Sequence, residues 1–494
     1  MALDPRTPVI IGVGQHLQRT DRGEPALEPV DLMRLAIEAA EIDAGAAGSS
    51  ARAEVVAVVP VISWGYRDPG RLLAAQLGAA GAATWYPAMG GNTPQMLITK
   101  LSAAIAAGDV DLGVVVGAEA YRSRVAAKRS GEPVDWTKQA DDVVADWTEG
   151  DPFVLGHPAE LTHGIAMPTQ AYPLFETALW HDSGRSLAEH LTYIGEMWAH
   201  YSQVAVDNPY AWRREALTSD ELTTPTAENR LVGFPYTKRM VANPDVDMAA
   251  GCIVCSVERA RALGVASDRW VFPHAGTDGK DRVMSQRRDL VSSPAIGVAG
   301  NLALDLAGTR VDEVEHLDVY SCFPSAVQLA CRELGIDTDR TLTVYGGLPF
   351  AGGPWNNPVS HAVASMVAVL REDAGSLGLV TANGGNVDKH AFGVYSTSPP
   401  TDGFRSARPQ EAIDAVAGRD VLEGYAGPVT IEGWTVMHER DGSPSRAHAA
   451  CLTPTGARVW GVSADDDLMS TFESDDVGGT AAAMDADGTL HLDD

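Results

Sequence analysis

Cysteines, basic residues and long apolar runs are all scarce in this sequence, and each scarcity excludes a class of protein. Five cysteines among 494 residues are too few for a disulfide framework. Cys252 and Cys255 form a C-x-x-C inside an apolar segment typical of a buried strand, without a second pair to complete a zinc site. We therefore expect core cysteines and no bound metal. No window approaches about 18 consecutive apolar residues, so no membrane-spanning helix is expected.

Acidic residues outnumber basic ones, 66 against 37, which leaves a formal net charge of -29. Such a charge repels phosphate backbones, so nucleic acid is not expected as a partner. A nucleotide-bearing ligand would need a local basic patch, for which Arg122, Arg124, Lys128 and Arg129 are candidates. The first residues lack the basic-then-apolar pattern of a signal peptide, so we expect a cytoplasmic protein.

One sequence design occurs twice, at positions about 260 residues apart. The first copy is the glycine turn Met89–Pro94, an apolar helical pattern and the buried run Leu112–Ala120. The second is the glycine turn Ala351–Pro358, another helical pattern and the run Leu377–Gly385. A glycine turn before a helix leaves backbone N–H groups free at the positive end of the helix dipole, where an anion can bind. The repeat predicts a duplicated α/β fold with both helix N-termini facing a shared centre.

The composition between and after these copies predicts two further parts. Residues 121–245 are richer in Trp, Tyr, His and charge, with helices expected over Ala188–Ala205 and Arg213–Ala216, which is typical of an insertion lying over the core. After Pro409, short apolar runs separated by tight turns predict a small β-barrel of OB-like type. The predicted division is a first half formed by residues 1–120 with 246–266, an inserted loop domain at 121–245, a second half at 267–405, and a C-terminal β domain at 410–494.

Several segments, taken in their order along the chain, carry a resemblance to a known family. Besides the first glycine turn they are Gly12–Gln15, Asp318–Pro324, Tyr345–Pro354 and Ala382–Gly385. Over roughly residues 8–400 the chain resembles the thiolase superfamily, above all the branch called thiolase-like protein type 1, often labelled acetyl-CoA acetyltransferase. The resemblance implies a five-layer α/β/α/β/α fold, and the tail after Pro409 fits the additional C-terminal domain of that branch. It also implies an acyltransferase relative that handles acyl-CoA in lipid metabolism.

The catalytic positions implied by the resemblance are substituted in this sequence. Thiolases use one cysteine to carry the acyl group as a thioester, a second cysteine to move a proton, and histidine- or asparagine-containing loops to assist them. The resemblance places the nucleophile at Gly90, the histidine of the Gly-His-Pro loop at Gly353, a further loop histidine at Tyr320 and the second cysteine at Thr381. A separate Gly156–Pro158 (Gly-His-Pro) lies in the insertion, and we interpret it as a coincidence. Ordinary thiolase activity is therefore expected to be lost or altered.

Three side chains remain as candidate catalytic groups. Cys322 lies in the loop that borders the thiolase active site and is either a displaced nucleophile or a packed core thiol. His361, near the start of the second helix, is either a general base or a structural histidine. His390 follows the last glycine loop and is either a site residue or a buried anchor. Candidates for substrate binding are Met167 and Tyr172, where thiolases wrap the pantetheine arm, and Asn357, Asn383 and Gly384 in the glycine turns.

Three functional hypotheses follow from the sequence. The first is a thiolase-like protein that binds CoA or acyl-CoA as a ligand, with no covalently bound cofactor. The second is a non-catalytic binding or scaffold protein of lipid metabolism that acts with a partner protein through its C-terminal domain. The third is a different acyl-transfer or lyase reaction that uses Cys322 with His361 or His390. Thiolases usually pair through the strand near the first glycine turn, so a homodimer is the assembly to test.

Overall fold

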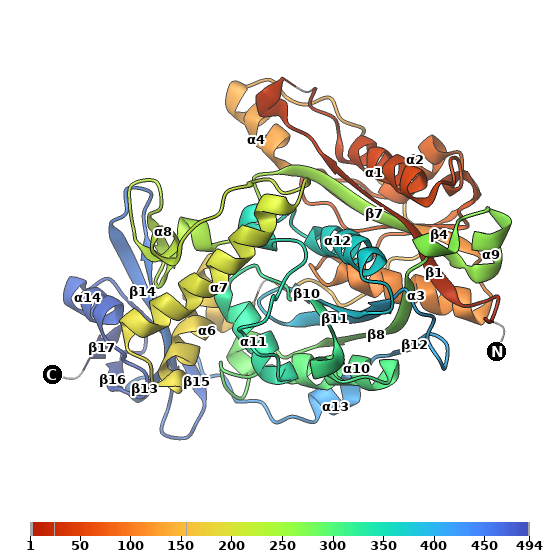
Figure 1. Cartoon of the computed structure of the whole chain (residues 1–494). Helices are drawn as coiled ribbons and strands as arrows, with labels where there is room; N and C mark the ends of the chain where they lie inside the picture. The colour runs from red at the N-terminus through yellow and green to blue at the C-terminus, as the bar shows by residue number, and fades with distance from the viewer. Residues whose placement is uncertain (1–2, 24, 155, 493–494) are drawn as a thin grey trace.

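Two five-stranded sheets face each other across a pair of buried helices in the computed structural model, which describes residues 3–23, 25–154 and 156–492. The buried helices are α3 (Thr93–Ala107) and α12 (Pro358–Glu372), and both contact both sheets. Helices α1 (Pro29–Ala44) and α2 (Pro69–Leu77) cover the outer face of the first sheet, and α10 (Asn301–Ala307) covers the outer face of the second (Figure 1). The predicted five-layer arrangement is confirmed.

The two sheets repeat one strand order. In the first sheet β7 lies antiparallel between β1 and β4, and β2 runs parallel to β4; in the second, β11 lies antiparallel between β8 and β10, and β9 runs parallel to β10. The duplication predicted from the glycine turns is therefore present in the strand order. The first sheet contains β1 (Pro8–Leu17), β7 (Asp247–Ser256), β4 (Leu112–Ala120), β2 (Val55–Val58) and β3 (Ala83–Trp85). The second contains β12 (Arg405–Ala407), β8 (Phe272–Lys280), β11 (Lys389–Ser396), β10 (Leu377–Gly384) and β9 (His316–Asp318).

Successive side chains of a strand point to opposite faces of the sheet, so alternate residues of the first sheet pack into two different hydrophobic cores. Ile10 packs toward α3 and α12, whereas its neighbours Val9 and Ile11 pack under α1. All residues of β4 and β7 are buried, which explains why both segments are apolar apart from Glu119, Asp247 and Ser256. Cys252 and Cys255 lie buried in β7, where burial raises the pKa of both thiols, as expected for core cysteines.

The inserted region consists mainly of helices that lie beside the core. They are α4 (Tyr121–Ser130), α5 (Pro158–Thr162), α6 (Pro168–Ser183), α7 (Leu187–Asp207) and α8 (Ser219–Thr223). Helix α7 confirms the helix expected over Ala188–Ala205, but the helix expected over Arg213–Ala216 is wrong because that segment is not helical. The backbone N–H groups of Trp212 and Arg213 donate instead to Ala351 O and Phe350 O, each at 2.9 Å, so this backbone is bonded to another segment.

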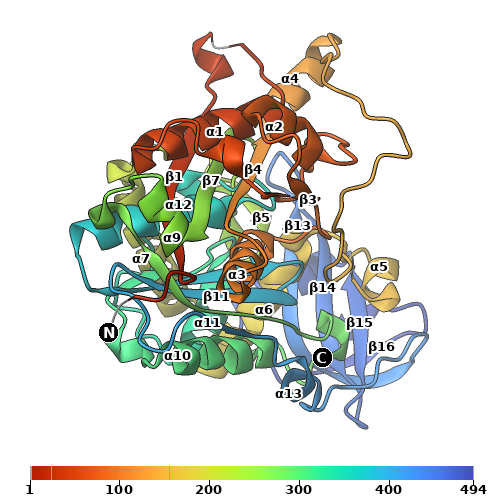
Figure 2. The same ribbon diagram turned by 90° about the vertical axis from the view of Figure 1, so that its right-hand side faces the viewer.

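A third sheet forms the C-terminal part, beside α5 and α6 (Figure 2). Its strands are β13 (Gly427–His438), β14 (Pro444–Leu452), β15 (Arg458–Ser463), β16 (Ala481–Met484) and β17 (Leu490–Leu492), with helix α14 (Asp466–Ser474) packed on it. Val462 of β15 forms a single bridge to Thr489, so the sheet curls back on itself in a barrel-like way. Strand β5 (Leu231–Gly233) of the inserted region pairs with β13 and with β6 (Tyr236–Thr237), which joins the two parts.

The outer edge of β3 is covered by the chain itself. Trp147 forms a parallel bridge to Trp85; its N–H donates to Thr84 O at 3.0 Å, and its carbonyl accepts from Tyr86 N at 2.9 Å. Asp146 accepts a further bond from Thr84 N at 2.8 Å. Unpaired edges invite pairing with another chain, and this edge is already occupied. No helix among the described residues is long and apolar enough to cross a membrane.

Candidate functional site

The first glycine turn packs directly against the end of β10, so the two halves interlock at the centre. A Cβ added to Gly384 would lie 2.8 Å from Gly91 N and 3.1 Å from Gly90 Cα. A Cβ added to Gly91 would overlap Asn383 O and lie 2.6 Å from the Tyr320 hydroxyl oxygen. Glycine is therefore required here for close approach of two backbones, independent of any catalytic role.

The space at the implied nucleophile position is occupied by other side chains. A Cβ at Gly90 would overlap Asn92 Oδ1 and lie 3.4 Å from Lys389 Cδ. The Lys389 ammonium donates to Met89 O at 2.9 Å and to Asp151 O at 2.6 Å, so its stem is held across the turn. Burial lowers the pKa of this amine. A nucleophilic side chain at position 90 would require Asn92 to move.

Three of the predicted site residues meet on one side of this turn. Asn383 Nδ2 donates to the Tyr172 hydroxyl at 2.9 Å and lies 3.8 Å from Cys322 Sγ. The Tyr172 hydroxyl donates in turn to Gly385 O at 3.1 Å, and its ring stacks on Phe323 with centroids 4.4 Å apart. Burial raises the pKa of Tyr172 well above its ordinary value and that of Cys322 to about 12. At neutral pH Cys322 is therefore a thiol, whereas the thiolate is the nucleophilic form.

A small cavity of about 10 Å³ lies next to this cluster. Its polar lining comes from Tyr320, Thr381, Asn383 and His390. A cavity of this size holds about one water molecule. Thr381 Oγ1 accepts from Tyr320 N at 2.9 Å, so the threonine at the second cysteine position fixes the loop before Cys322. The cavity that these polar groups line is therefore too small for an acyl chain.

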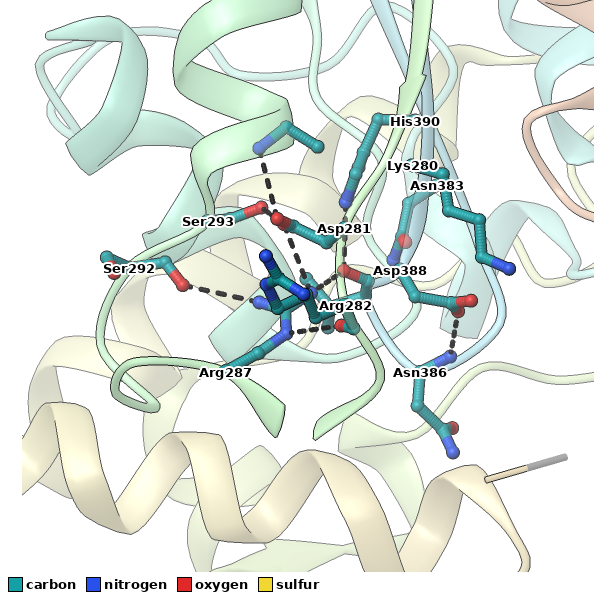
Figure 3. Close-up of polar contacts among 12 residues, drawn as sticks. Lys280, Asp281, Arg282, Arg287, Ser292, Ser293, Asn383, Asn386, Asp388 and His390 are labelled. Carbon is teal, nitrogen blue, oxygen red and sulfur yellow. Dashed lines mark hydrogen bonds and ion pairs between the residues drawn. The ribbon is translucent and has the colours of Figure 1, made fainter. Parts of the chain in front are cut away.

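A buried network holds the hairpin between β10 and β11 (Figure 3). Val387, at its tip, is fully buried with φ 63, a left-handed conformation that is strained for a β-branched residue. Its carbonyl accepts hydrogen bonds from Arg287 and from His390 Nε2, the latter at 2.9 Å. Arg287 also pairs with Asp281 at 3.2 Å. The network keeps the strained tip in place beside the cavity.

Asp388 follows Val387 in the same hairpin and is also buried. Its Oδ1 accepts from Asn386 N at 3.0 Å, but its Oδ2 has no hydrogen-bond partner within the described ranges. Burial raises the pKa of Asp388 to about 6. Sequence reasoning missed Arg287, Asp281 and Asp388, because Arg287 and Asp281 lie about 100 residues before the hairpin and no local pattern marks them.

The two candidate histidines occupy separate places. His390 lines the cavity with Asn383, and burial lowers its pKa to about 4. His361 instead bonds Gln15 Oε1 through Nδ1 at 2.7 Å and stacks on Tyr345, with centroids 5.7 Å apart. Burial lowers its pKa to about 3, so it stays neutral at physiological pH but is a weak base there. The structure brings only His390 toward the Cys322 cluster.

The remaining predicted residues have local roles. Asn357 Nδ2 donates to Gly117 O at 2.7 Å and its Oδ1 accepts from Ser360, which ties the start of α12 to β4. Met167 precedes α6 and is 49% exposed, whereas Tyr172 on the same helix is buried. His157, of the separate Gly-His-Pro, precedes α5 and its Nδ1 accepts from Ala159 N at 3.2 Å.

Comparisons with known proteins give the family. The family model of the thiolase-like protein type 1 additional C-terminal domain matches residues 409–489. A monomeric SCP2-thiolase like protein type 1 from Mycobacterium smegmatis, of known crystal structure, is 31% identical, with a TM-score of 0.84 over 99% of this chain and 100% of that chain. A comparison with curated proteins finds no match.

More distant structures share the fold alone. The Ltp2-ChsH2(DUF35) aldolase is 18% identical, with a TM-score of 0.61 over 80% of this chain and 99% of that chain. The acetyl-CoA acetyltransferase from Syntrophomonas wolfei is 15% identical, with a TM-score of 0.55 over 79% and 99% of the two chains. The chain has the repeated sheets, the interlocked glycine turns and a relative that is 31% identical over its whole length. It therefore belongs to the thiolase-like protein type 1 family of the thiolase superfamily.

Proposed function

We propose that this protein binds CoA or acyl-CoA in the manner of a thiolase relative but does not carry out the thiolase reaction. The observation that carries the proposal is the first glycine turn. Its framework is retained, yet Gly90 has no nucleophile and Asn92 and Lys389 occupy the space in front of it. Covalent acyl transfer needs a thiolate or an equivalent nucleophile at the acyl carbon.

The family relationship supports a CoA ligand more than any other. The fold is shared with an acetyl-CoA acetyltransferase, and α3 and α12 each begin after a glycine turn, where the positive end of the helix dipole favours an anion. A role in lipid metabolism is proposed on the same grounds. The relative from Mycobacterium smegmatis is described as monomeric, and the covered β3 edge supports a monomer here too.

The test combines binding with chemistry. We expect CoA and acetyl-CoA to bind in isothermal titration calorimetry, and acetoacetyl-CoA to remain uncleaved when excess CoA is added. Robust thiolysis would contradict the proposal that thiolase activity is lost. An absence of CoA binding would contradict the proposal that CoA is the ligand. The variant Asn92→Ala serves as a control, because it opens the space at Gly90 without adding a nucleophile.

A different acyl transfer through Cys322 and His390 is the second candidate. It is favoured by the shared contact with Asn383, which touches Cys322 Sγ and lines the cavity with His390. It is opposed by the raised pKa of the buried thiol and the lowered pKa of the imidazole. If it operates, acetyl-CoA labels Cys322 in intact-protein mass spectrometry and the Cys322→Ala variant is not labelled; an unlabelled parent chain eliminates it.

A partner protein is the third candidate. The Ltp2-ChsH2(DUF35) aldolase, whose name joins two components, has a related fold. In this chain the C-terminal sheet is already joined to the inserted region through β5, and Arg458 donates from the sheet to the carbonyls of Met284, Ser285 and Arg287. A stable complex of defined mass, isolated with the full-length chain from its native host, would support this candidate; a lone chain with CoA affinity would oppose it.

A further inference from the structure

A surface pocket in the inserted region gathers basic side chains on an otherwise acidic protein. It has a volume of about 240 Å³ and lies beside the turn Gly347–Ala351. Its lining residues are Arg213, Glu215, Leu217, Glu228, Lys238, Arg239 and Phe350. Three cations against two carboxylates give a positive lining in a chain whose formal charge is -29. We call this site the basic pocket.

Backbone hydrogen bonds from separate segments fix the three cations. Arg213 N donates to Phe350 O at 2.9 Å, which holds its extended segment against the glycine-rich turn. Lys238 N donates to Arg230 O at 2.9 Å, and Arg239 N donates to Asn229 Oδ1 at 2.9 Å. The pocket is therefore built on bonded backbone, although the side chains of Arg213 and Lys238 reach the solvent.

Two carboxylates, Glu215 and Glu228, line the pocket with the three cations, but neither lies at salt-bridge distance from them. Over residues 3–23, 25–154 and 156–492, Arg213, Lys238 and Arg239 form no salt bridge, whereas nearby Arg122 pairs with Asp245 at 3.0 Å. Arg239 donates to Glu221 O at 3.4 Å, and its charge also acts on the Glu221 carboxylate. Partial burial and then repulsion from Arg239 lower the pKa of Arg213. Glu215 offsets part of this repulsion, and three cations against two carboxylates leave the lining with a net positive charge that favours an added anion.

We propose that the basic pocket binds the phosphate end of a phosphorylated organic ligand. Guanidinium groups bind phosphate through paired hydrogen bonds, and Leu217 and Phe350 provide an apolar wall for an adjoining group. The pocket is smaller than a typical site for a whole ligand, roughly 300–1,000 Å³, so it takes the end of the molecule and leaves the rest outside. The ligand is either the 3′-phosphorylated ADP end of CoA, which rests on the proposed function, or a free nucleotide.

The pocket wall is connected to the central site through short backbone links. Asn243 N donates to Leu348 O at 3.1 Å, and Ala242 N donates to Cys322 O at 3.1 Å. Leu348 N also donates to Ser321 Oγ at 3.4 Å. The turn that forms one wall of the pocket thus also supports the loop carrying Cys322. A long ligand anchored by its phosphates in the pocket would begin close to this loop.

Isothermal titration calorimetry on the full-length chain distinguishes the two candidate ligands, the phosphorylated end of CoA and a free nucleotide. The probes are CoA, dephospho-CoA, adenosine 3′,5′-bisphosphate, ADP and pantetheine. We expect CoA to bind more tightly than dephospho-CoA, and the affinity to fall as salt is raised. Arg213→Gln and Arg239→Gln should each weaken CoA roughly 10- to 100-fold, the usual range for a lost charge-assisted hydrogen bond. Glu215→Gln should strengthen it, and Arg214→Gln, whose Nε bonds Val206 O outside the pocket, is the matched control.

Each outcome decides one proposal. If CoA and pantetheine bind but Arg213→Gln and Arg239→Gln leave CoA affinity unchanged, the basic pocket is overturned and the proposed CoA ligand stands. A different outcome is that ADP and adenosine 3′,5′-bisphosphate bind through these arginines, while CoA binds no more tightly and pantetheine does not bind. The basic pocket is then a site for a free nucleotide, and the proposed CoA ligand is overturned. If none of the probes binds, both proposals are overturned. Circular dichroism of each variant confirms that the fold is intact.

Discussion

The two glycine turns look alike in sequence but differ in their surroundings. At the first, a Cβ on Gly91 would overlap the backbone of β10 and press on the Tyr320 hydroxyl. At the second, a Cβ on Gly353 would touch Ala242 Cβ, Asn243 O and Leu348 Cβ, each at 3.4 Å, which is close to ordinary contact. A side chain is therefore excluded by backbone at Gly91 but would meet only contact-distance neighbours at Gly353, whereas Gly352 beside it has φ 117 and would overlap Met248 Sδ. A duplicated element can keep its shape in both copies while the space beside matching glycines differs.

Alanine substitutions at Gly91 and Gly353 test the difference between the two turns most directly. Gly91→Ala forces apart two backbones, so we expect a loss of about 3 kcal/mol or more in the free energy of unfolding. Gly353→Ala should cost under about 1 kcal/mol, because its neighbours already stand at contact distance. Thermal melts followed by circular dichroism measure both. Equal losses in the two variants would contradict the difference between the turns.

The hairpin that borders the first turn gives a pH-dependent prediction. Because burial raises the pKa of Asp388 to about 6, the folded chain holds this proton more tightly than the unfolded chain does. The contribution of Asp388 to stability is therefore greatest below its unfolded pKa of about 4 and is lost as pH rises to about 6. Asp388→Asn should be more stable than the parent at pH 7.5, by about 1–3 kcal/mol, with the gap closing near pH 4.

Thermal melts across this pH range check the prediction, with Asp339→Asn, at an exposed carboxylate, as the control. A constant difference between Asp388→Asn and the parent at all pH values would refute it. So would a variant that is less stable than the parent at pH 7.5.

The lysine across the first turn gives a smaller effect. Lys389→Met keeps the stem against Gly90 but removes the bonds to Met89 O and Asp151 O, so we expect a loss of about 1–2 kcal/mol. Lys280, directly opposite in β8 and without a side-chain hydrogen bond in the described part of the chain, is the matched control. Urea unfolding of both methionine variants measures the difference. If Lys280→Met costs as much, the amine is not what holds this turn.

The smallest backbone effect is expected at the edge of the first sheet. Trp147→Pro removes the N–H that donates to Thr84 O, a bond worth about 1 kcal/mol, together with the indole that packs on Trp85, and frees β3 to pair with a second copy. Sedimentation should show a monomer for the parent and concentration-dependent association for the variant. Val144→Pro changes the same segment at an exposed position without a bond to β3. A dimeric parent would show that covering the edge does not prevent pairing.

Much of the fold was predictable because it is set by local patterns. The repeated glycine turns, each followed by an apolar helix and a buried strand, predict the two facing sheets, and short strands after Pro409 predict the barrel-like sheet. The segment Arg213–Ala216 was predicted wrongly as a helix, because its N-terminal neighbour Trp212 and Arg213 itself bond to the turn before Gly352. That tertiary partner is invisible in a local window.

The candidate site was predicted in part. The resemblance led to Tyr172, Cys322 and Asn383, which the fold brings together, and to His390, which lines the adjoining cavity. The sequence offers Arg122, Arg124, Lys128 and Arg129 as candidates for a basic patch, whereas the cations of the proposed basic pocket come from two other segments. Arg122 is instead neutralised by Asp245. A charge count along the chain cannot show which cations find partners.

By itself, the sequence determined which side chains are absent. Glycine at positions 90 and 353 removes two catalytic groups in any conformation, because a residue without a side chain has no nucleophile or base to offer. Only the tertiary structure decided what replaced them. Lys389, Asn92 and Tyr320 fill the first turn, while Gly353 of the second meets neighbours only at contact distance. These contacts join segments up to 300 residues apart, whose positions are set by packing of the two sheets.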